Sequence, residues 1–143
     1  YRRQRQMCIR DRNGVKGVEW IGWSDEIFRI LNQADIMCLP SYREGLPKSL
    51  IEAAACGLPI VTTDTVGCRE VVTNGQNGYL VPVKDVVKLA YYLKKLIEDK
   101  NLRKNMGIYS RMIAVKEFGS TRIINETMQV YFSLIGSDES API

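Results

Sequence analysis

The chain has 143 residues, 45% of them apolar and 25% charged, which is an ordinary composition for one globular domain. No apolar run approaches the roughly 20 residues that cross a bilayer, and the absence of histidine excludes a Ser-His-Asp or Cys-His catalytic group within the chain. The net charge of +4 comes from residues 1–13, which hold five of the 20 basic residues and one acid. Because the remainder is neutral, this distribution argues against nucleic-acid binding.

Three segments follow from these patterns. Residues 1–13 have no hydrophobic period, and we interpret them as a disordered or non-native basic segment; an arm that binds phosphate or anionic lipid is the alternative. Residues 14–135 contain the periodic apolar segments and are expected to form one domain. Residues 136–143 are polar and are expected to be a frayed tail. We recognise no secretory leader.

In chain order, apolar and β-branched segments predict four short strands, at residues 18–21, 35–39, 59–63 and 79–81. Apolar residues at helical spacing predict the helices: one with Ser24 as its N-cap, then residues 47–56, 68–72, 86–97, 102–117 and 123–135. Pro47 would lie in the first turn of the second of these helices, and Gly57 follows its end.

Strands that alternate with helices imply parallel pairing, because each connection is long enough to cross over the sheet. We therefore predict an α/β fold: a Rossmann-like, doubly wound parallel sheet with flanking helices and extra C-terminal helices. Such sheets bind ligands beyond the carboxyl ends of their strands. This rule indicates the loops after Ile21, Leu39 and Thr63, and residues 41–45 are the most suggestive of them.

The four cysteines, at positions 8, 38, 56 and 68, form no Cys-x-x-Cys pair, and no histidine is present to complete a zinc site. No metal site is therefore expected. Cys38 and Cys56 lie in apolar runs and are interpreted as small core residues. Free thiols of this kind suit a reducing cytoplasm.

The junction between the loop at residues 41–45 and the following helix favours an anion. The first turn of a helix leaves backbone N–H groups unpaired at the positive end of its dipole, which suits a diphosphate. Pro47 cannot donate a hydrogen bond, so the available N–H groups are those of Gly45, Leu46, Lys48 and Ser49. The absence of a side chain at Gly45 lets a ligand approach the backbone closely.

Two carboxylates, Glu44 and Glu52, flank this junction. Eight residues of helix would separate them by about 12 Å, whereas glycoside hydrolases hold their paired carboxylates roughly 5–9.5 Å apart. The spacing therefore suits two ends of one elongated ligand, bound through its hydroxyl groups. The alternative is that Glu44 only complements the helix dipole and that Glu52 is a solvated surface residue.

Residues 39–61 resemble the signature of the family 4 glycosyltransferases, which share the GT-B fold. That signature is Glu-x7-Glu followed by Ala, and then Gly-x-Pro with two β-branched residues; here it begins at Glu44, and its Gly-x-Pro begins at Gly57. The resemblance extends over about residues 17–135. Its further matches are Gly22, Ala34-Asp35, Gly67, Glu70 and the Asn-Gly-x-x-Gly of residues 74–78.

The resemblance implies roles for the two acids. Glu44 would be the catalytic residue of this domain, holding hydroxyls of the donor sugar near the anomeric centre, beside the N–H groups of Gly45 and Leu46. Glu52 would bind the ribose hydroxyls. Arg69 and Glu70 are interpreted as helix surface; the alternative is that they support the residues that contact the donor.

The resemblance also implies contacts to the rest of the donor. The backbone amides of Lys48 and Ser49 would face the diphosphate, and Trp23 would lie near the base. For Trp23, a core or interdomain position is the alternative.

As a whole, the resemblance implies a retaining glycosyltransferase that binds a nucleotide-diphosphate sugar, UDP-linked hexose or N-acetylhexosamine. The acceptor would be a glycan or a lipid-linked saccharide in surface-polysaccharide or glycoconjugate biosynthesis. No metal and no cofactor are expected, and the protein would be cytoplasmic, with peripheral association at the inner face of the membrane. The alternatives are a GT-B nucleotide-sugar epimerase and a non-catalytic nucleotide-sugar-binding module.

The chain lacks parts of the family pattern, so we expect the domain to be incomplete on its N-terminal side. The acceptor-binding domain and the opening strand with its diphosphate-binding Arg and Lys are missing, and the spacing of Lys48 and Lys84 does not support either as a substitute. The chain alone should bind donor weakly and transfer nothing. The last helix reaches the missing domain in this fold, so its apolar stripe should be exposed; the stripe comprises Ile124, Met128, Tyr131 and Phe132.

Overall fold

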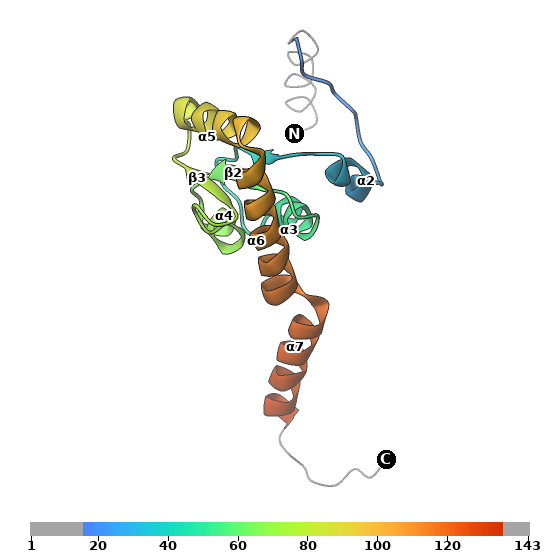
Figure 1. The fold of residues 1–143 in the computed structure, drawn as a ribbon. Coiled ribbons are helices and arrows are strands. Elements are labelled where there is room, and N and C mark those ends of the chain that lie inside the picture. Colours follow the sequence, from blue (N-terminus) through green and yellow to red (C-terminus); the bar gives the residue numbers. More distant parts are fainter. Residues whose placement is uncertain (1–15, 136–143) are drawn as a thin grey trace, which may run out of the picture.

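The computed structural model describes residues 16–135, so the expectations for residues 1–13 and 136–143 lie outside the described residues. Three strands and six helices follow one another along them (Figure 1): α2 (Ile27–Asn32), β1 (Met37–Leu39), α3 (Lys48–Ala55), β2 (Ile60–Thr63), α4 (Val66–Val71), β3 (Gly78–Val81), α5 (Val86–Glu98), α6 (Lys100–Phe118) and α7 (Ser120–Ile135). All but one of the predicted elements are present, with boundaries shifted by at most three residues.

The three strands form one parallel sheet in the order β1-β2-β3. Met37 pairs with Ile60, and Ile60 pairs with Gly78, so the strands begin nearly level with one another. A helix lies in each connection, because parallel neighbours need a crossover. The predicted α/β class with a parallel, Rossmann-like sheet and flanking helices is confirmed.

The strand predicted at residues 18–21 is wrong. These residues have no regular structure, and Val18, Trp20 and Ile21 are exposed. The apolar pattern is suitable for a strand, but a strand also needs a neighbour for its backbone hydrogen bonds. Within residues 16–135, the sheet ends at β1, which pairs with β2 alone.

The helix start predicted at Ser24 is also wrong. Helix α2 begins at Ile27 with Glu26 at the N-cap position, and no side chain caps its first turn. Ser24 Oγ accepts a hydrogen bond from the Glu26 N–H at 3.0 Å, so the serine stabilises a turn that precedes the helix.

Helices cover both faces of the sheet, and side chains alternate between the faces along each strand. In β2, Ile60 packs with α3 and α4, while Val61 packs with α5 and the first part of α6. All four residues of β2 are buried, as expected for a central strand. The sheet is thus the middle layer of three.

Helix α6 runs along the edge of the sheet where the strands begin. A Cβ atom on Gly107 would lie 2.2 Å from the carbonyl oxygen of Gly57, so the two backbones are in contact. Gly57 ends α3 with a φ of 73°, a conformation that few other residues adopt readily. Ser110 Oγ donates to the carbonyl oxygen of Asn77, just before β3, at 3.2 Å. Helix α6 therefore covers the amino-terminal edge and leaves the carboxyl edge uncovered.

The cysteines are less uniformly buried than predicted. Cys68 is fully buried, and its Sγ lies 3.2 Å from Thr62 Oγ1. Cys38 and Cys56 are only half-buried, although burial is enough to raise the pKa of both thiols. The interpretation of Cys38 and Cys56 as core residues is therefore only partly right.

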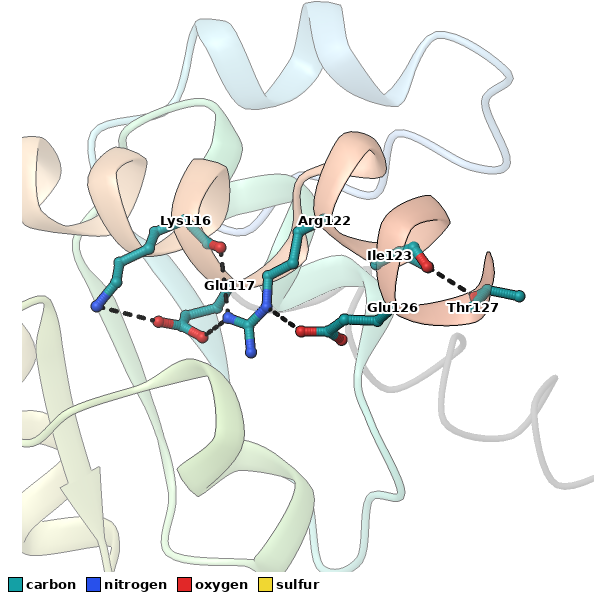
Figure 2. Close-up of polar contacts among 6 residues, drawn as sticks. All are labelled: Lys116, Glu117, Arg122, Ile123, Glu126 and Thr127. Carbon is teal, nitrogen blue, oxygen red and sulfur yellow. Dashed lines mark hydrogen bonds and ion pairs between the residues drawn. The ribbon is translucent and has the colours of Figure 1, made fainter. Parts of the chain in front are cut away.

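Arg122 joins α6 to α7 (Figure 2). Its guanidinium group forms an ion pair with Glu117 of α6 and another with Glu126 of α7, where Nε lies 2.7 Å from Oε1. The hydrogen bond from Arg122 lowers the pKa of the Glu117 carboxyl. Lys116 lies 3.4 Å from the same carboxylate. These ion pairs bridge the break between the two helices at Gly119.

Helix α7 extends away from the sheet (Figure 1), and none of its residues is buried. The predicted exposure of its apolar stripe is confirmed: Ile124, Met128, Tyr131 and Phe132 are all exposed. Among residues 16–135, no helix combines the length and the apolar character that crossing a membrane requires.

Candidate functional site

The loops that follow β1, β2 and β3 all lie at the carboxyl edge of the sheet, where hydrogen bonds join the ends of the strands. Thr62 Oγ1, near the end of β2, donates to the carbonyl oxygen of Leu39 at the end of β1, with 2.8 Å between the oxygens. On the other side, the N–H of Asp64 donates to the carbonyl oxygen of Val81 at 2.7 Å. The loops after β1, β2 and β3 therefore start from one edge, as the topology of parallel strands requires.

The loop at residues 41–45 is held from two sides. Thr63 Oγ1 donates to the carbonyl oxygen of Ser41. From α4, the backbone of Gly67 lies so close that a Cβ atom there would be 1.6 Å from the carbonyl oxygen of Gly45 and 2.8 Å from that of Glu44. The loop that carries Glu44 is therefore seated between the end of β2 and the first turn of α4.

The first turn of α3 has unpaired backbone N–H groups, as predicted. Pro47 occupies the N-cap position with a φ of −74°, and no side chain of the described residues caps the helix. The first N–H within the helix to find a backbone acceptor is that of Leu50, which donates to the carbonyl oxygen of Pro47 at 3.0 Å. Within residues 16–135, no protein acceptor pairs with the amides of the four residues named from the sequence: Gly45, Leu46, Lys48 and Ser49.

These amides are also open to a ligand. Gly45 and Lys48 are exposed, and a Cβ atom on Gly45 would meet nothing within 4 Å. Leu46 is exposed as well, so its side chain contributes little to the core. The start of α3 can therefore accept an anion without displacing a protein group.

Both predicted acids lie near this helix start and are partly buried. Glu44 accepts a hydrogen bond from Ser41 Oγ at 2.6 Å. Glu52 lies just over one turn into α3, with a side chain that is 18% exposed, and its Oε1 is 3.5 Å from Lys48 Nζ. Glu52 is therefore not an ordinary solvated surface residue, and its partner Lys48 brings a positive charge to the first turn of the helix.

Trp23 is the one predicted site residue that the structure does not place beside the others. Its side chain is 84% exposed, and it belongs to the irregular segment before α2 that stands off from the sheet in Figure 1. The role near a base that the resemblance implies for Trp23 stays a prediction.

A hollow of about 260 Å³ opens on the α5 side of the same edge. Lys84 Nζ lies 5.9 Å from the centroid of the Tyr42 ring and so links the loop after β3 to the loop after β1. The wall is formed by the loops after β1 and β3, the ends of β2 and β3 and the start of α5: Pro40, Ser41, Tyr42, Thr63, Val81, Pro82, Lys84, Asp85, Val86 and Leu89. Tyr42 and Thr63 were not predicted as site residues. Their positions immediately after β1 and at the end of β2 are the only sequence signal for them.

One charged pair borders the site. Arg69 Nε on α4 lies 2.5 Å from Asp64 Oδ1 in the loop after β2, and this hydrogen bond lowers the pKa of the Asp64 carboxyl. Arg69 and Glu70 are both exposed, in agreement with their interpretation as helix surface. In the described part of the chain, no three His, Cys, Asp or Glu side chains are grouped closely enough to hold a metal ion.

Comparison with known proteins agrees with this arrangement. The model of the family described as "Glycosyl transferases group 1" matches residues 2–112. The chain is similar to N-acetyl-alpha-D-glucosaminyl L-malate synthase of Bacillus anthracis, with 32% identity over 126 residues, which cover 88% of this chain and 33% of the relative.

A second relative is an N,N'-diacetylbacillosaminyl-diphospho-undecaprenol alpha-1,3-N-acetylgalactosaminyltransferase of Campylobacter jejuni, with 39% identity over 90 residues, which cover 63% of this chain and 24% of that protein. The chain thus spans a third or less of the length of these two relatives.

Among solved structures, Anabaena Alr3699/HepE in complex with UDP has a similar fold. Its TM-score is 0.83 at 23% identity, over 93% of this chain and 37% of that one. The signature of paired acids, the open helix start beyond the strands, the family match and the shared fold lead to one assignment. The chain belongs to the group 1 glycosyl transferases and has the parallel α/β sheet of the C-terminal half of the GT-B fold.

Proposed function

We propose that this chain is the donor-binding part of a retaining glycosyltransferase and that it binds a UDP-linked hexose or N-acetylhexosamine at the start of α3. The observation that carries the proposal is the set of unpaired amides at this helix start, with a partly buried acid on either side. An anion would neutralise the positive end of the helix dipole, and the acids would accept hydrogen bonds from hydroxyl groups.

The names of the relatives support the choice of sugar. The Bacillus relative is named for an N-acetylglucosaminyl product, and the Campylobacter relative is named as an N-acetylgalactosaminyltransferase that acts on a diphospho-undecaprenol saccharide. The solved Anabaena structure, which is similar in fold, contains UDP. We therefore propose a glycan or lipid-linked saccharide as acceptor, in surface-polysaccharide or glycoconjugate biosynthesis, at the cytoplasmic face of the membrane.

In the proposed reaction, the bond between the anomeric carbon and the diphosphate breaks, and negative charge develops on the leaving diphosphate. The amides of Lys48 and Ser49 and the dipole of α3 are positioned to stabilise that charge. The Lys48 ammonium group adds a positive charge in the same turn. Because these groups can compensate the charge of the leaving group, we propose that transfer needs no metal ion, and the activity of the full-length enzyme should persist in excess EDTA.

The test is a change at Glu52, the acid proposed to hold the ribose. Glu52→Gln keeps the shape of the side chain but removes a charge-assisted contact worth about 1.5–3 kcal/mol, so the Kd for UDP should rise about 10- to 100-fold. Isothermal titration calorimetry or NMR titration with UDP measures it. Glu98→Gln is the matched control, because Glu98 is an exposed acid that pairs with Lys94 at the far end of α5.

An unchanged UDP affinity in Glu52→Gln would count against the proposed site. The stereochemistry is tested separately, by NMR analysis of the anomeric configuration of the transferred sugar. An inverted product would refute the retaining assignment. Release of an epimerised sugar without transfer would instead indicate a nucleotide-sugar epimerase.

A further inference from the structure

The hydroxyl group of Ser41 connects Glu44 to the sheet. Ser41 Oγ donates to Glu44 Oε1 at 2.6 Å, a short contact of the kind that charged acceptors form. Among the residues that the structure describes, the only other acceptor near this hydroxyl is the carbonyl oxygen of Arg43, at 3.5 Å. The single proton of the serine hydroxyl is therefore committed to the carboxylate.

Ser41 is itself held by the strands. Its N–H donates to the carbonyl oxygen of Leu39 at 3.0 Å, and its carbonyl oxygen accepts from the buried Thr63 Oγ1 at the end of β2. Thr62 Oγ1 fixes the carbonyl oxygen of Leu39 in turn. The position of the serine hydroxyl is thus set by the rigid end of the central strand, more than 20 residues away in the sequence.

Glu44 needs such a constraint because its side chain is long. Glutamate has three rotatable side-chain bonds and loses about 1.5–2 kcal/mol of rotamer freedom when it is ordered. The contact with Ser41 occupies Oε1 and leaves Oε2 without a protein donor among the described residues. The close packing of Gly67 against the carbonyl oxygens of Glu44 and Gly45 limits movement of the backbone from the other side.

We propose that Ser41 is a positioning residue, which holds the Glu44 carboxylate so that Oε2 is presented to the hydroxyls of the donor sugar. The inference rests on the proposed function and deepens it, because it concerns the sugar part of the site alone. The nucleotide contacts, at the start of α3 and at Glu52, do not involve Ser41. A loss of the Ser41 hydroxyl therefore acts on a UDP-sugar and spares UDP.

The experiment compares two probes, UDP and UDP-N-acetylglucosamine, by NMR titration of the full chain and its variants. In Ser41→Ala, the Kd of the UDP-sugar is expected to rise about five- to tenfold, while the Kd of UDP stays within about twofold. Ser41→Thr restores the hydroxyl and should restore the affinity for the sugar. In a Glu44→Ala background, Ser41→Ala should cause no further loss, because the group that it positions is gone.

The outcomes separate the two proposals. If Ser41→Ala lowered the affinity for both probes equally, Ser41 would have a structural role, and the inference would be overturned. A full additional loss of UDP-sugar affinity on adding Ser41→Ala to Glu44→Ala would overturn it as well. Absence of any binding of UDP to the wild type would overturn the proposed function and the inference with it. If the wild type binds UDP but Glu44→Ala leaves the affinity for the UDP-sugar unchanged, then Glu44 does not contact the sugar. That result would refute the role of Glu44, and therefore that of Ser41, but not the nucleotide site.

Discussion

Replacing Gly67 by alanine tests the contact that seats the proposed catalytic loop. Gly67 is buried in the first turn of α4, and an added Cβ atom would lie 1.6 Å from the carbonyl oxygen of Gly45, 2.4 Å from its carbonyl carbon and 2.8 Å from the carbonyl oxygen of Glu44. Real Cβ atoms essentially never approach another heavy atom within 3.0 Å, so the helix and the loop must separate by about 1.4 Å. The obstacle is backbone, which cannot rotate away as a side chain can.

Two effects of opposite sign set the expected change in the free energy of unfolding. Insertion of a methyl group into a packed contact costs about 1–3 kcal/mol, and a clash with backbone on this scale belongs at the upper end. Exchange of glycine for alanine within a helix contributes about 1 kcal/mol in the other direction. We therefore expect Gly67→Ala to lower the free energy of unfolding by about 2 kcal/mol. Because the displaced segment contains Glu44, the variant should also bind a UDP-sugar more weakly.

Urea denaturation followed by circular dichroism measures the loss of stability as a shift of the midpoint at constant slope. Gly45→Ala is the matched control, because its Cβ atom would meet nothing within 4 Å and its φ is not positive. That control should stay within about 0.5 kcal/mol of the wild type, although it should hinder a ligand at the helix start. A Gly67→Ala protein as stable as the wild type would refute the close contact between α4 and the loop.

Two further predictions concern the frame around the site. Asn77 is fully buried; its side chain accepts a hydrogen bond from the N–H of Thr73 at 2.8 Å and donates one to the carbonyl oxygen of Val71 at 3.0 Å. Asn77→Ala should therefore lower the free energy of unfolding, measured by urea denaturation, by about 3 kcal/mol. A loss of less than about 1 kcal/mol would contradict these hydrogen bonds. Asp64 has a lowered pKa in the folded state because of Arg69, so its stabilising effect is present above its unfolded pKa of about 3.9 and is lost as the pH falls through the folded value. Since both groups are exposed, Asp64→Asn should cost less than about 1 kcal/mol at pH 7, and the cost should shrink as the pH is lowered. Thermal melts of the variant and the wild type at neutral and acidic pH measure it, and a difference in Tm that grew on acidification would contradict the prediction.

Much of the site was predictable because its parts are close together in the sequence. The helix at residues 47–56, the proline at its start and the glycine after it are local signals, and α3 follows them to within one residue at each end. The unpaired amides at the start of α3 follow from that helix. The parallel sheet was predictable as well, because alternating strands and helices admit few other arrangements.

The local sequence pattern gave wrong predictions where contacts with residues distant in the sequence decide the structure. Residues 18–21 have a suitable composition for a strand, but pairing depends on an adjacent edge, and they are exposed. Ser24 is a good cap by residue type, but the chain completes one more turn before α2 begins. Cys38 and Cys56 lie in apolar runs, yet their burial depends on what packs over β1 and over the end of α3, and here they are half-buried.

The fold class, the order of the elements and the helix start that can bind an anion were therefore predictable, because each depends on periodicity or on residues within one helix turn of one another. The way in which the loop with Glu44 is held depends instead on long-range contacts: Thr63 donates to Ser41, 22 residues away in the sequence, and Gly67 contacts Gly45 across the same separation. Contacts of this kind depend on strand register and helix placement to within about an ångström. No local pattern carries that information, because it arises only when the strands and helices pack together.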